Sequence, residues 1–131
     1  MKNLLILIAL STFFWVSCTK KQNSIQGVWQ YVEDDQLNKI NGMSFFTKDN
    51  FAFVVNYEGK NSDSSQKSLA YSGTYILEDT LVTATILHAQ NPQLIGRKLR
   101  WIHRSNGNDA SYEVLDKNGK VVQKGKVKRL E

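Results

Sequence analysis

The stretch RKLRWIHRSNGNDASYEVLD, residues 97–116, decides the fold class of this chain. Its first half alternates between two faces, with Leu99, Trp101 and His103 on one and Lys98, Arg100, Ile102 and Arg104 on the other. Asn106-Gly107-Asn108 follows, and a second short segment comes directly after it. An Asn-Gly pair between two such segments is a strong hairpin signal, because both residues tolerate positive φ. The stretch therefore predicts two antiparallel strands with side chains sorted onto two faces.

The same pattern continues through the rest of the chain from Ile25. Short segments are separated by turn sequences such as Lys48-Asp49-Asn50 and Lys117-Asn118-Gly119-Lys120, and no stretch of ten residues has a helical period. The expected strands are residues 27–33, 43–46, 51–58, 69–77, 80–89, 97–105, 109–116 and 121–130. Residues 59–68 are expected to form a polar loop, and residues 91–96 one helical turn.

Consecutive strands joined by tight turns form a meander. Eight antiparallel strands can either close into an up-and-down barrel or fold as two packed sheets, and closure removes exposed sheet edges. The sequence therefore predicts an all-β domain, with the closed barrel favoured.

The N-terminus has the features of a secretory signal. Lys2 is followed by the uncharged run 4–16 and then by Ser17. A membrane-spanning helix needs about 20 apolar residues, and this run is shorter. Residues 1–17 are therefore expected to be a signal peptide that is removed.

Cys18 is the only cysteine, and it lies between that run and the polar stretch 19–24. This placement resembles the lipobox of bacterial lipoproteins, in which the peptidase cuts before the cysteine and the thiol carries a diacylglycerol. A lone exported cysteine has no disulfide partner, and two or three acyl chains give stable anchoring. The resemblance implies lipidation of Cys18, with residues 18–24 as a tether and residues 25–131 as the domain. The alternative is an ordinary cleaved signal in which Cys18 has no role.

No aspartate directly follows the cysteine, so the inner-membrane retention signal of enterobacterial lipoproteins is missing. The expected location is the cell envelope at the outer membrane, with the periplasmic and external faces both open.

Composition and motifs exclude several classes of function. The chain is 41% hydrophobic and 22% charged, as in globular proteins, and one cysteine excludes a disulfide framework and a cysteine-ligated zinc site. Nucleophile-elbow, His-Glu-x-x-His and phosphate-loop motifs are absent. The acidic run Glu33, Asp34 and Asp35 is expected to be a solvated loop. No enzyme activity, metal or cofactor is therefore expected.

Charge is uneven along the chain. Residues 97–131 hold ten basic and four acidic side chains, whereas residues 19–96 hold six basic and eight acidic ones. Export argues against nucleic acid as the partner of the basic half. Anionic lipid headgroups or lipopolysaccharide phosphates fit better, and a basic face that only aids solubility is the alternative.

Residues near the two ends of the domain suggest how the barrel closes. Arg129 falls on the inward face with Val127, and it needs an aromatic or acidic partner there. Trp29 is the expected partner, because the last strand lies beside the first in a closed barrel.

Gly27-Val28-Trp29, together with Arg129, resembles the lipocalin and fatty-acid-binding (calycin) superfamily. Four further segments, residues 46–51, 71–75, 91–96 and 127–130, look like those of small lipocalin-like lipoproteins of Gram-negative bacteria. The resemblance implies that the Trp29 indole packs across the barrel bottom beneath Arg129.

The inward faces supply the candidate ligand-binding residues: Phe53, Val55, Tyr57, Tyr71, Tyr75, Trp101 and His103. The expected function is a membrane-anchored carrier or sensor of a small apolar molecule. In the alternative, these aromatic side chains fill a core, and the protein is an interaction module that docks another envelope component or anionic headgroups.

Overall fold

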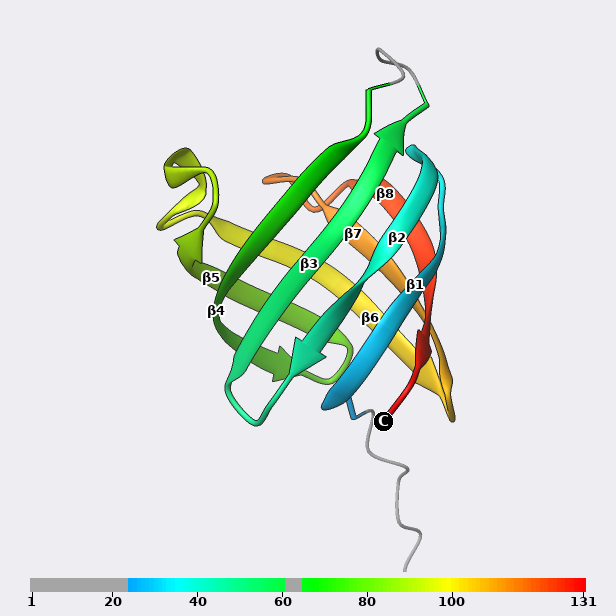
Figure 1. Cartoon of the computed structure of the whole chain (residues 1–131). Coiled ribbons are helices and arrows are strands. Elements are labelled where there is room, and N and C mark those ends of the chain that lie inside the picture. Colours follow the sequence, from blue (N-terminus) through cyan, green and yellow to red (C-terminus); the bar gives the residue numbers. More distant parts are fainter. Residues whose placement is uncertain (1–23, 61–64) are drawn as a thin grey trace, which may run out of the picture.

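Eight antiparallel strands make up most of the chain that the structure describes (Figure 1). The structure is a computed structural model that describes residues 24–60 and 65–131. The strands are β1 (Gly27–Asp34), β2 (Leu37–Phe46), β3 (Asn50–Gly59), β4 (Lys67–Glu78), β5 (Leu81–Ala89), β6 (Lys98–Asn106), β7 (Asp109–Leu115) and β8 (Val121–Arg129). A single 3-10 turn, η1 (Pro92–Leu94), lies between β5 and β6, where the helical turn was expected. Among the described residues, no helix has the length and apolar character needed to cross a membrane.

The sheet closes on itself. Each strand pairs with the next, and β8 pairs with β1, so that the predicted all-β up-and-down barrel is confirmed. Figure 1 shows β1, in blue, lying between β2 and the red β8. Trp29 and Arg129 are direct partners in the β1–β8 ladder. Closure therefore leaves neither the first nor the last strand with an unpaired edge.

β2 is longer than predicted, because it begins at Leu37 and not at Met43. Its inward positions include Gly42 and Ser44, which remove the apolar alternation that marks a strand in sequence. The backbone ladder to β3 nevertheless extends from Leu37 to Phe46. Pairing with a neighbouring strand has overridden weak local propensity.

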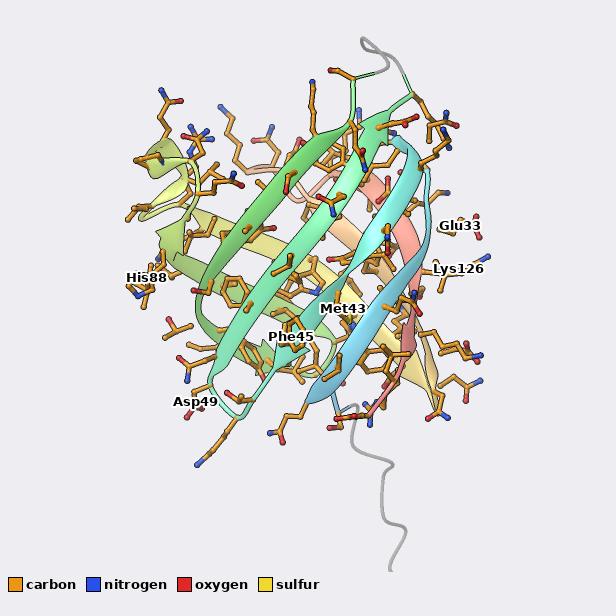
Figure 2. The ribbon with its side chains drawn as sticks, viewed as in Figure 1. Glu33, Met43, Phe45, Asp49, His88 and Lys126 are labelled. Carbon is orange, nitrogen blue, oxygen red and sulfur yellow. The ribbon has the colours of Figure 1, made fainter. Side chains whose placement is uncertain are left out.

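Alternation predicts the inward faces of most strands correctly. Phe51, Phe53 and Val55 are buried on β3, as are Trp101 and His103 on β6. His88 is an exception, because the alternation places it on the inward face with Ile86 but it is exposed (Figure 2). A register shift puts Ile86 opposite Gly73 and His88 opposite Ser72, so the extra residue between them moves His88 to the outer face.

The two ends of the barrel differ in their connections. The chain enters β1 and leaves β8 at one end, which also carries the β2–β3, β4–β5 and β6–β7 turns (Figure 1). The other four connections lie at the opposite end, which we call the mouth. We call the end where the chain enters β1 and leaves β8 the closed end. The candidate site is the space inside the barrel between the closed end and the mouth.

Candidate functional site

The barrel contains a cavity of about 310 Å³. Every strand except β5 contributes to its wall, which consists of Trp29, Tyr31, Leu37, Ile40, Ser44, Phe46, Phe53, Val55, Tyr57, Leu69, Tyr71, Leu99, Trp101, His103, Tyr112, Val114, Gln123 and Val127. The inward side chains of β5, Val82, Ala84 and Ile86, are packed into the core. Ligand sites in proteins typically occupy about 300 to 1,000 Å³, so this cavity has the size of a small-molecule site.

Trp29 forms the floor of the cavity and is completely buried. Its Nε1 donates a hydrogen bond to the Ile25 carbonyl oxygen at 2.7 Å, and the Arg129 guanidinium lies 4.5 Å from its ring centroid. Arg129 also donates to the Ser24 carbonyl oxygen at 2.7 Å. The first and last strands are thus joined by a cation-π contact, and this arrangement covers the end where the chain enters and leaves the barrel.

Gly27 allows the end of the chain to approach β1. A Cβ atom at this position would lie 2.3 Å from the Glu131 carbonyl oxygen, and the residue has a φ of 127°. Val28 donates its N–H to that same oxygen at 3.1 Å. The glycine of the Gly27-x-Trp29 motif is therefore required by close backbone approach.

Aromatic rings form the layer above the floor. Phe53 lies 5.1 Å from Tyr71 and 6.0 Å from Trp101, centroid to centroid, and both pairs meet edge to face. Phe46 contacts Phe53 in the same way at 5.7 Å. These rings form an apolar wall for the cavity and at the same time contribute to the core of the barrel.

Four of the wall residues are tyrosines: Tyr31, Tyr57, Tyr71 and Tyr112. Tyr31 and Tyr112 meet edge to face, with ring centroids 5.7 Å apart. Burial raises the pKa of Tyr31, Tyr71 and Tyr112 well above its ordinary value, and the negative charge of Asp34 adds to the rise at Tyr31 and Tyr112. All three phenols are therefore neutral at physiological pH.

His103 lies near the floor, with its ring 5.1 Å from that of Trp29 in an edge-to-face arrangement. Burial lowers the pKa of His103 to about 4, and the nearby Arg129 charge adds to the effect. The imidazole is therefore neutral at pH 7, and it presents a polar but uncharged group to the cavity.

The structure brings together most of the sequence-predicted site residues. Phe53, Val55, Tyr57, Tyr71, Trp101 and His103 all line the cavity. Tyr75 lies outside this wall, because its ring packs against Phe46 and its hydroxyl donates to the Thr47 carbonyl oxygen at 2.5 Å. Tyr75 therefore belongs to the closed end of the barrel.

Asp34 is a second residue, after His88, that the sequence placed wrongly. We expected Glu33, Asp34 and Asp35 to form a solvated loop, but Asp34 ends β1 with only 4% of its surface exposed. Its carboxylate accepts hydrogen bonds from Tyr112 and Gln123, which both line the cavity. No local signal marks it, because these partners lie 78 and 89 residues away along the chain.

Several wall residues were also missed. Tyr31 could have been found by extending the alternation from Trp29, and Tyr112 by applying it to residues 109–116. Ser44 lies in the predicted strand 43–46, but its polar side chain gives no sign of burial, and Ile40 lies outside that predicted strand.

Cys18, residues 1–17 and most of the tether 18–24 lie outside the described residues. Within residues 24–60 and 65–131, no three His, Cys, Asp or Glu side chains gather in a way that could hold a metal ion. Neither a protein-family model nor a curated protein sequence matches the chain.

Proposed function

We propose that this chain is a lipid-anchored, lipocalin-like lipoprotein of the bacterial cell envelope that binds a small hydrophobic molecule in its barrel. The cavity of about 310 Å³ is the observation that carries the proposal. A largely apolar wall with a few oriented polar groups is typical of small-molecule sites. The hydroxyls of Tyr31 and Tyr112, the His103 imidazole and the Gln123 amide supply those polar groups.

In this proposal the protein is anchored through Cys18, after removal of residues 1–17, and lies at the outer membrane. Ser24 lies at the closed end of the barrel, where Arg129 binds its carbonyl oxygen. The stretch from Cys18 to Ser24 can span at most about 20 Å. An anchor on Cys18 would therefore hold the closed end near the membrane and direct the mouth away from it.

Native mass spectrometry of the full-length protein, purified from its own host, tests the carrier function. We expect a small apolar molecule to copurify. Val55→Trp fills the cavity from β3 and should abolish copurification. Val54→Trp is the matched control, because it places the same ring on the outer face of that strand, where Val54 is 51% exposed, and it should leave copurification unchanged. A thermal melt checks that both variants fold.

Repeated failure to find a copurifying molecule in the unaltered protein, with no change in melting temperature across a panel of apolar compounds, would contradict the carrier function.

An exposed apolar patch favours a second candidate function, docking to another envelope protein. Met43 and Phe45 on β2 point outward (Figure 2). Val54 on β3 is also exposed, and it lies directly opposite Met43. Adjacent exposed apolar side chains often mark interaction sites. Val54→Lys should weaken capture of such a partner and leave ligand copurification intact.

The basic outer faces of β6 and β8 are the alternative docking surface, for anionic headgroups.

A further inference from the structure

A buried carboxylate lies directly behind the polar side of the cavity wall. Asp34 Oδ1 accepts hydrogen bonds from the backbone N–H groups of Gln36 and Leu37 at 2.8 and 3.0 Å. Its Oδ2 accepts from the Tyr112 hydroxyl and from Gln123 Nε2, the latter at 2.7 Å. All four partners are donors, which is the environment that an ionised carboxylate requires.

This carboxylate determines what the wall can offer a ligand. Tyr112 lines the cavity, and because its proton is committed to Asp34, its phenolic oxygen can take part in a further hydrogen bond only as an acceptor. The geometry of β8 maintains this bond, because Gly125 leaves the space that the Tyr112 hydroxyl occupies. At Tyr112 the wall therefore offers an acceptor to a ligand group that donates a hydrogen bond.

The charges around the cavity favour the same kind of ligand. Among the wall residues that the structure describes, none is Lys, Arg, Asp or Glu. Lys60 donates to the backbone oxygen of Asp34 at 3.2 Å, and it is exposed and lies outside the wall. Arg129 lies beneath Trp29, on the far side of the floor. A ligand carboxylate would have to lose its hydration without a facing cation and close to the charge of Asp34.

We propose that the cavity selects a small apolar molecule whose polar end is a hydrogen-bond donor, an alcohol or an amine, that donates to the phenolic oxygen of Tyr112. Asp34 acts as a positioning residue, because it holds the Tyr112 proton and disfavours carboxylates. This inference rests on the proposed carrier function, and it implies that fatty acids are poor ligands.

Three linear ligands with eight carbon atoms each test the selection: octanol, octylamine and octanoate. Each is titrated at pH 7 into the full-length chain in phosphatidylcholine nanodiscs and followed by calorimetry, with empty nanodiscs as the blank. We expect octanol and octylamine to bind at least about tenfold more tightly than octanoate. Equal or tighter binding of octanoate would overturn the inference and leave the carrier function standing.

Asp34→Asn should reduce the difference in affinity between octanol and octanoate, since it removes the buried charge. Asp49→Asn is the matched control, because it removes the same charge from the exposed β2–β3 turn at the closed end (Figure 2). If Asp34→Asn fails to fold, Tyr112→Phe tests the same step, and it should weaken octanol binding while leaving octanoate binding unchanged. An unchanged preference in a folded Asp34→Asn or Tyr112→Phe variant would overturn the role of this pair.

Absence of binding by all three compounds would also overturn the inference. The carrier function would then stand if a molecule still copurifies with the native protein, and it would fall with the inference if none does.

Discussion

Trp29 combines three interactions that depend on its indole ring: complete burial, the hydrogen bond to Ile25 and the cation-π contact with Arg129. Trp29→Ala should therefore lower the free energy of unfolding by about 3 to 5 kcal/mol, as for other buried large-to-small changes. Urea denaturation measures the loss. Val32→Ala on the same strand is the control, because Val32 is 60% exposed and the change should cost less than about 0.5 kcal/mol. A loss below about 1 kcal/mol for Trp29→Ala would contradict its role in closing the barrel.

His103 makes stability depend on pH. Its pKa of about 4 in the folded protein lies below the ordinary value of 6.5, so the unfolded chain binds a proton that the folded protein does not between these two pH values. Stability from this residue is present above about pH 6.5 and is lost as the pH falls toward 4.

Between pH 7 and pH 4.5, the free energy of unfolding should therefore fall by about 2 to 3 kcal/mol more in the unaltered protein than in the His103→Gln variant. Urea denaturation of both proteins at the two pH values measures this difference. Equal losses would show that the protonation of His103 is not linked to folding.

At the scale of elements, β8 packs closely against its neighbours β1 and β7 at Gly125. A Cβ atom on Gly125 would lie 2.2 Å from the Glu33 backbone oxygen and 2.5 Å from the Tyr112 hydroxyl oxygen. Gly125→Ala should therefore destabilise the protein by about 1 to 3 kcal/mol through overpacking. Thermal melts measure the effect, with Lys124→Ala on the same strand as an exposed control. Unchanged stability in Gly125→Ala would contradict the close packing of β1, β7 and β8.

The elements also show where sequence reasoning succeeds. Strands with strict alternation, such as β3 and β6, have the predicted inward faces, because alternation and burial have the same physical cause. β2 was predicted too short, since Gly42 and Ser44 on its inward face hide the pattern. His88 was placed on the wrong face because a bulge depends on how two strands pair, and neither strand shows this by itself.

At the scale of the whole molecule, the proposed lipid anchor on Cys18 would determine at which membrane surface the barrel is located. Cys18→Ala should release the protein from the membrane fraction, because a single substitution removes the only thiol that could carry acyl chains. Fractionation followed by immunoblotting measures the release. Asn23→Ala in the same stretch is the matched control and should remain membrane-bound. Membrane retention of the Cys18→Ala variant would contradict the lipoprotein assignment.

The sequence by itself determined the fold class, the number of strands and the partnership of Trp29 with Arg129. These follow from turn residues, from the period of two along each strand and from the pairing of first and last strands that closure requires. The tertiary structure alone decided the size of the cavity and the burial of Asp34 between Tyr112 and Gln123. Sequence patterns could not predict this cluster, because turn and strand propensities act over a few residues. The cluster joins Asp34 to side chains 78 and 89 positions away, and it exists only once the barrel has closed in the observed register.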